Sequence, residues 1–94
     1  MAEIETLVLP NKFDYSYHRK FDEEYGALLQ KTACKEIILD FSSVEYLDSA
    51  AIGMMFLLQK KCANLQKVVK LKGAYGATAD ILEMAQIKKL FEFI

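Results

Sequence analysis

A short apolar segment at residues 36–41 (EIILDF) constrains the fold of this chain more than any other feature. Its length and its β-branched centre are typical of a buried central strand. Other stretches with the period of a strand alternate along the chain with stretches that have the period of a helix. This alternation predicts an α/β domain: a single sheet of about four strands, parallel or mixed, whose parallel strands are joined by right-handed helical crossovers.

The bounds of the other elements follow from periodicity and from residues that can cap a helix. We expect strands at Ile4–Leu9, Glu36–Phe41, Lys67–Lys72 and Leu90–Ile94. We expect helices at Tyr17–Lys31, Ser49–Leu65 and Thr78–Ala85. Asp14 or Ser16 could cap the first helix. Thr78 would cap the last one, with Asp80 in its first turn.

The helix expected at 49–65 carries more apolar surface than one sheet-facing side requires. At 100° per residue, the side facing the sheet would hold Ala51, Met54, Met55, Leu58, Cys62 and Leu65. A second stripe at its flank holds Ile52, Phe56 and Ala63. We expect this stripe to meet a neighbouring helix or, in part, to bind a partner.

Composition is that of one compact soluble domain. The chain has 94 residues, of which 53% are hydrophobic and 27% charged, and we expect one domain over residues 1–94. No apolar run approaches the roughly 18 residues that a membrane-spanning helix needs, so we expect no membrane insertion. The acidic start MAEIETLVLP does not resemble a signal peptide, which favours a cytoplasmic location.

Metal and nucleic-acid binding are both disfavoured. Cys34 and Cys62 form no CxxC pair, and the single histidine, His18, has no Cys or His at ligand spacing. We therefore expect neither a metal nor a cofactor. Nine acidic and five basic residues fall in 1–47, and seven basic and four acidic in 48–94. This gradient is too weak for nucleic acid, although it could orient a protein partner.

Two adjacent polar residues, Asp48 and Ser49, lie where the largely apolar stretch 44–56 passes from a loop into a helix. The simplest interpretation is a helix cap, because Ser and Asp both satisfy free backbone N–H groups there. Another interpretation is that Ser49 accepts a phosphoryl group. Phosphate would add a charge of about −1.5 to −2 at a helix N-terminus, which favours anions. A partner docked on the same corner would meet that charge, so the site could act as a switch.

Catalysis is disfavoured at the same pair. The nucleophile elbow of hydrolases has the pattern G-x-S-x-G, whereas Leu47 and Ala51 flank this serine. A serine nucleophile also needs a base, and His18 has no evident orienting partner. The chain has no G-x-x-x-x-G-K phosphate loop either. We expect that the protein is not an enzyme.

The segment IILDFSSVEYLDSAAIGMMFLL closely resembles the signature of the STAS domain family, the anti-sigma-factor antagonists. KFDYSYHRKF and ATADILEMAQIKKLFEFI resemble the segment entering that family's first helix and its closing helix and strand. The resemblance covers nearly the whole chain and implies a compact α/β protein-binding domain without catalytic activity. The family's additional N-terminal strand would be missing here. We therefore expect an exposed sheet edge that could permit a homo-oligomer.

The resemblance also implies partner switching. Ser49 falls on the family's phosphoacceptor position, with Asp48 as the preceding acid. Ala50 stands in place of a second serine and Ala51 in place of a glycine. The unphosphorylated form would bind a serine-kinase anti-sigma factor or an analogous regulator, and a PP2C-type phosphatase would reverse the modification. The kinase would bind the phosphoryl donor, so no nucleotide site is expected in this chain.

Four further residues are candidates for the site. The partner would contact Ile52, Phe56, Ser42 and Ser43. The two serines could also be secondary phosphorylation sites or simply form the turn. The alternative function is that of a non-switching accessory subunit of a lipid-transport ATP-binding cassette complex. The apolar stripe with Ile52 and Phe56 would suit such a permanent interface.

Overall fold

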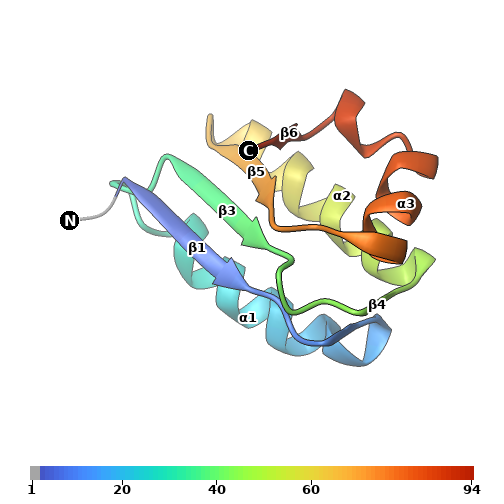
Figure 1. Cartoon of the computed structure of the whole chain (residues 1–94). Coiled ribbons are helices and arrows are strands. Elements are labelled where there is room, and N and C mark those ends of the chain that lie inside the picture. Colours follow the sequence, from blue (N-terminus) through green and yellow to red (C-terminus); the bar gives the residue numbers. More distant parts are fainter. Residues whose placement is uncertain (1–2) are drawn as a thin grey trace.

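The computed structural model describes residues 3–94 and contains a four-stranded sheet whose strands are all parallel. The strand order is β1–β3–β5–β6, in which β1 spans Ile4–Val8, β3 Glu36–Asp40, β5 Val68–Lys72 and β6 Glu92–Phe93. Each strand is added on the same side of the one before it (Figure 1). Right-handed crossovers in one direction bring their helices to one face of the sheet. This confirms the expected α/β fold.

Three helices connect the strands. They are α1 at His18–Leu29, α2 at Ser49–Asn64 and α3 at Gly76–Met84. Short 3-10 turns precede α1 at Tyr15–Tyr17 and follow α3 at Ile87–Lys89. A separate two-stranded parallel ribbon joins β2 at Lys12–Phe13 to β4 at Tyr46–Leu47.

The core lies between the sheet and the helices. Leu39 and Leu71 point into it from neighbouring strands, and Met55 and Leu58 meet them from α2. These four side chains are fully buried. On the other face of the sheet, Ile4, Val8 and Val68 are about half exposed or more. One side of the sheet is therefore uncovered within residues 3–94.

Several local expectations were wrong. Thr78 does not cap α3, which begins two residues earlier at Gly76, so Asp80 falls beyond the first turn. Thr78 is instead buried, and its hydroxyl donates to the Val44 carbonyl at 3.2 Å. Asp14 caps the 3-10 turn rather than α1, by accepting from the Ser16 amide at 3.0 Å.

The face predicted for α2 was correct apart from its last residue. Ala51, Met55, Leu58 and Cys62 are buried, whereas Leu65 is 51% exposed. The helix ends at Asn64, so the position of Leu65 no longer follows the helical period. We expected the flanking stripe of α2 to meet a neighbouring helix. Its Phe56 instead stacks on Phe91 in the segment before β6, with ring centroids 6.3 Å apart.

Candidate functional site

The loop after β3 leads the chain to Asp48 and Ser49 at the carboxyl ends of the strands. A turn closes first, with the Val44 amide donating to the Phe41 carbonyl at 3.0 Å. Ser42 and Ser43 are the two central residues of this turn and both are exposed. Their position matches the expected role of turn residues. The chain then pairs with β2 as β4 and enters α2.

Asp48 is the cap of α2. Its Oδ1 accepts from the backbone N–H of Ala51 at 2.9 Å, and its carbonyl oxygen accepts from the N–H of Ile52 at 3.3 Å. The backbone of Asp48 is extended, as expected for the residue just outside a helix. Capping thus accounts for the aspartate of the polar pair.

Ser49 is the first residue of α2, and its side chain is exposed. Among the described residues, its hydroxyl makes no hydrogen bond to another protein group. Of the two alanines that follow, Ala50 is half-buried and Ala51 is fully buried in the core. Ser49 is therefore the hydroxyl that this helix start presents to solvent.

The loop that leads from β3 to Asp48 and Ser49 is held by two contacts, one with Gly73 between β5 and α3 and one with Thr78 of α3. Gly73 has a φ of +79°, and a Cβ there would lie 3.0 Å from the backbone nitrogen of Ser42. Only glycine fits this close approach without strain. On the other side of the turn, the buried Thr78 hydroxyl holds the Val44 carbonyl. Thr78 was misassigned from the sequence as a helix cap, and the role of Gly73 was not predicted.

An aspartate at the end of β3 also belongs to this region. The backbone N–H of Ser42 donates to Asp40 Oδ1 at 2.9 Å, which lowers the pKa of the Asp40 carboxyl. The carboxylate therefore stays ionised and holds the start of the loop. It acts on the backbone, and no chemistry beyond this positioning follows from it.

The two predicted partner-contact residues on α2 differ in exposure. Ile52 is partly buried and packs against the core, and Phe56 is 36% exposed beside Phe91. Leu57, which lies apart from both predicted faces, is 47% exposed. Ile52, which packs against the core, and Phe56, which Phe91 partly covers, thus lie on the same helix as Ser49.

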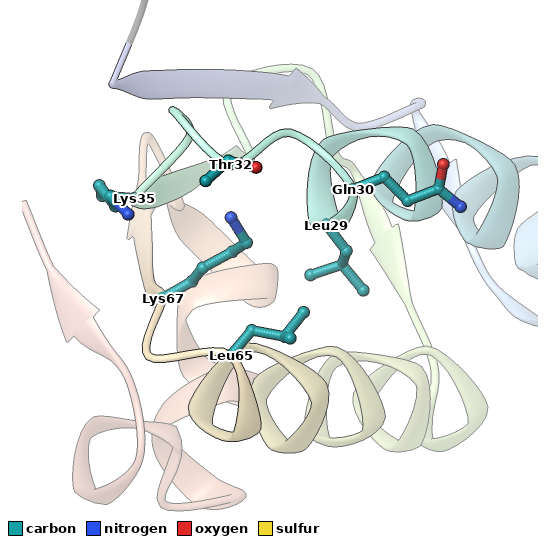
Figure 2. Close-up of a pocket in the computed structure, with 6 residues that line it drawn as sticks. All are labelled: Leu29, Gln30, Thr32, Lys35, Leu65 and Lys67. Carbon is teal, nitrogen blue, oxygen red and sulfur yellow. The ribbon is translucent and has the colours of Figure 1, made fainter.

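A small pocket of about 180 Å³ lies at the opposite end of the sheet, where the strands begin. Figure 2 shows Leu29 and Leu65 on its two sides and the ammonium of Lys67 directed toward the segment that holds Thr32. Lys67 is only 8% exposed, which is unusual for a lysine. Its Nζ donates to the carbonyl oxygens of Lys31, at 2.9 Å, and of Cys34. These bonds give the lysine a structural role.

The described part of the chain lacks two features on which other classes of function depend. Over residues 3–94, none of the helices has both the length and the apolar character that crossing a bilayer requires. The same residues contain no group of three or more His, Cys, Asp or Glu side chains placed to hold a metal ion. Both cysteines are free thiols and buried.

Comparison with known proteins assigns the family. The family model described as "Mlab, STAS domain" matches residues 3–92, which is nearly the whole chain. The chain belongs to this STAS family. A STAS-domain containing protein of Pseudomonas aeruginosa (strain UCBPP-PA14) is 24% identical over 87 residues, covering 93% of this chain and 84% of that protein.

Solved STAS structures share the fold but differ in their descriptions. The anti-sigma factor antagonist SpoIIAA in its unphosphorylated form has a TM-score of 0.82 at 10% identity, covering all of this chain and 83% of the other. SpoIIAA of Bacillus in its phosphorylated form has a TM-score of 0.74 at 12% identity, with 100% and 85% covered. The STAS domain of a SulP transporter from Vibrio cholerae has a TM-score of 0.79 at 18% identity, with 100% and 75% covered. At these identities the likeness concerns the fold alone.

Proposed function

We propose that this STAS protein is a binding module controlled by phosphorylation of Ser49 in a bacterial partner-switching pathway. When Ser49 is unphosphorylated, the module binds a serine-kinase anti-sigma factor or an analogous regulator. Phosphorylation by that kinase ends the interaction, and a PP2C-type phosphatase restores it. The protein itself catalyses no reaction and acts in the cytoplasm. The observation that carries the proposal is the exposed Ser49 hydroxyl beside an aspartate that already caps the helix.

The division of roles between the two residues supports a modification site. Asp48 already accepts the amide of Ala51, so a change at Ser49 leaves the cap in place. The amides of Ser49 and Ala50 come earlier in the turn than those that Asp48 accepts. They lie at the positive end of the helix dipole, where an added phosphate is tolerated. Asp48 opposes the new charge, so the corner becomes strongly negative.

A docked partner would respond to that charge more than the fold does. A phosphate adds about −1.5 to −2 charges at neutral pH. An acidic or apolar partner surface over the corner would then face a dianion without a counter-charge. Each 1.4 kcal/mol of penalty weakens binding about tenfold. SpoIIAA, which shares the fold, is described in both a phosphorylated and an unphosphorylated form.

Affinity capture from the native host tests the proposal. Baits with Ser49→Ala, Ser49→Asp and, as a matched control at the opposite end of the sheet, Thr32→Asp would be compared by quantitative mass spectrometry. We expect a kinase-like regulator on the Ser49→Ala and Thr32→Asp baits and its loss from Ser49→Asp. Circular dichroism of each bait checks that the fold is intact. Equal capture by the Ser49→Ala and Ser49→Asp baits would argue against the switch.

The second candidate is a permanent accessory subunit of a lipid-transport ATP-binding cassette complex. Exposed apolar side chains favour it: Leu57 on α2 is 47% exposed, Met84 at the end of α3 is 81% exposed and Leu90 is 52% exposed. A permanent interface would be expected to cover such side chains. In the same capture experiment, this function predicts transporter subunits on all three baits, irrespective of residue 49.

A further inference from the structure

The strand β1 lies at one edge of the sheet. Within residues 3–94 it pairs only with β3, and no strand lies on its outer side (Figure 1). An edge strand presents unpaired N–H and C=O groups, which can pair with the edge of another chain. The chemistry of β1 therefore determines what this edge can bind.

The hydrogen bonds at the two ends of β1 show which backbone groups face outward. The Leu9 amide donates to the Asp40 carbonyl at 3.1 Å, and the Glu3 carbonyl accepts from the Glu36 amide at 3.1 Å. Bonding to one neighbour recurs every second residue in a strand, so the odd-numbered residues of β1 bond to β3. The amides and carbonyls of Ile4, Thr6 and Val8 point away from the sheet.

The same three residues carry the side chains of the uncovered face. Leu7 is buried at 8% exposure against the helices, and side chains alternate along a strand. Ile4, Thr6 and Val8 therefore lie on the opposite face, where Ile4 is 51% and Val8 61% exposed. All three are β-branched residues, which pair well across strands.

The edge has little of the protection that monomeric proteins usually provide. Such edges commonly carry lysine, proline or a bulge. The five residues of β1 include one charged side chain, Glu5, and its Oε2 lies 3.4 Å from Lys31 Nζ. The strand forms its five register pairs with β3 without a bulge.

We propose that two copies of this chain dimerise by antiparallel pairing of their β1 edges, with the two-fold axis beside Thr6. Each Thr6 then pairs with Thr6 of the second copy, and each Ile4 with Val8 of the second copy. The pairs Thr6–Thr6, Ile4–Val8 and Val8–Ile4 are all hydrogen-bonded pairs, because they use the outward amides and carbonyls of both strands. The bonds to β3 stay intact. The two sheets become one sheet that continues through the dimer.

Side-chain pattern and charge both favour a second copy as the occupant. The sequence Ile4–Val8 places a β-branched residue opposite a β-branched residue throughout the uncovered face, and Thr–Thr pairs are favourable. On the helix face, Glu5 lies opposite Leu7 of the second copy, so no like charges oppose each other. Five paired residues make a smaller contact than a standard interface, so we expect a weak, concentration-dependent dimer.

Sedimentation equilibrium with matched variants tests the pairing, from low micromolar concentration to about 1 mM, the range of weak association. We expect the wild-type chain to dimerise and Thr6→Lys to weaken this at least tenfold, because two lysines would meet at the axis. Thr6→Glu should do the same. A mixture of the two variants should regain association, which an unfolded variant could not. Val68→Lys, on the same face but away from the edge, is the control and should dimerise like the wild type.

Disulfide trapping provides a second, independent readout. Hydrogen-bonded antiparallel pairs have Cα atoms about 5.5 Å apart, within disulfide range. Thr6→Cys should therefore form a covalent dimer at least tenfold faster than Val68→Cys. Cys34 and Cys62 are buried, so they should not interfere. A wild-type chain that stays monomeric up to the highest concentration, or a dimer that Thr6→Lys leaves unchanged, would overturn the proposal.

Discussion

At the amino ends of the strands a buried lysine meets the carbonyl oxygens that follow α1, whereas at the carboxyl ends an aspartate caps α2 and leaves its neighbouring serine exposed. Both ends thus gather polar groups at helix termini. At the amino end, Lys67 donates to Lys31 and Cys34 and stabilises the protein from within. At the carboxyl end, Asp48 satisfies the helix, and the hydroxyl of Ser49 is left for something outside the fold.

The comparison shows why a pocket alone does not identify a functional site. The pocket is concave, yet the buried one of its two lysines, Lys67, already donates to protein carbonyls. The Ser49 corner has an exposed hydroxyl with a helix terminus behind it. If this contrast is correct, substitutions at the two ends should differ in whether they change stability or binding.

The largest effect on stability is expected from Lys67→Met. This change keeps the apolar stem but removes the charged donor to the Cys34 carbonyl and one of the two donors to the Lys31 carbonyl, which also accepts from the Cys34 amide at 3.1 Å. We expect a cost of about 3 kcal/mol. Urea denaturation measures it. Lys35→Met, an exposed lysine at the same pocket, is the control and should change the free energy of unfolding by less than about 0.5 kcal/mol. Equal changes in the free energy of unfolding for the two variants would contradict a structural role of Lys67.

A smaller loss is expected from Gly73→Ala at the carboxyl end. The positive φ disfavours alanine, and its Cβ would press against the Ser42 nitrogen, so we expect a cost of about 2 kcal/mol. Gly53→Ala is the matched control, because it lies within α2 with nothing within 4 Å of the added Cβ. That change should stabilise the protein by about 0.5–1 kcal/mol. Thermal denaturation of both variants would show whether the signs are opposite.

Removal of the cap should cost less again. Asp48→Ala takes away the acceptor of the Ala51 amide, and we expect about 1 kcal/mol of destabilisation. Asp48→Asn keeps a side-chain oxygen and should recover most of the loss. Chemical denaturation compares the three proteins. If Asp48→Ala were neutral, the aspartate would not be the structural member of the pair.

The smallest effect on stability is expected from Ser49→Ala. The hydroxyl makes no protein hydrogen bond among the described residues, so the free energy of unfolding should change by less than about 0.5 kcal/mol. The same denaturation curves provide the test. A loss as large as that of Asp48→Ala would mean that Ser49, too, holds the helix.

Most of the fold could be predicted because it depends on local pattern. The apolar run at Glu36–Asp40 and the helical period of 49–64 follow directly from the sequence, and both elements end within one residue of the expected bounds. The errors arose where tertiary contacts override residue preference. Thr78 is a good capping residue, yet its hydroxyl donates to the carbonyl of Val44, which lies in a loop distant in the sequence. The burial of Lys67 depends on two loop carbonyls that only the folded chain brings together.

The candidate site shows the same limit. Asp and Ser are equally good helix caps, so the residue types at 48 and 49 could not show which one holds α2. The hydrogen bond from Ala51 to Asp48 assigns the cap and leaves Ser49 exposed. The close approach of Gly73 to Ser42 had no signal in the sequence beyond a glycine in a loop.

Calorimetric titration of the captured regulator with three forms of this chain tests the central claim most directly. The forms are the unmodified protein, the protein phosphorylated at Ser49, and a control phosphorylated at Thr32, an exposed residue at the opposite end of the sheet. We predict that phosphate at Ser49 weakens binding at least about a hundredfold, or 2.8 kcal/mol, while the control binds like the unmodified chain. Equal affinities of all three forms would contradict the account and leave Ser49 as an ordinary surface residue.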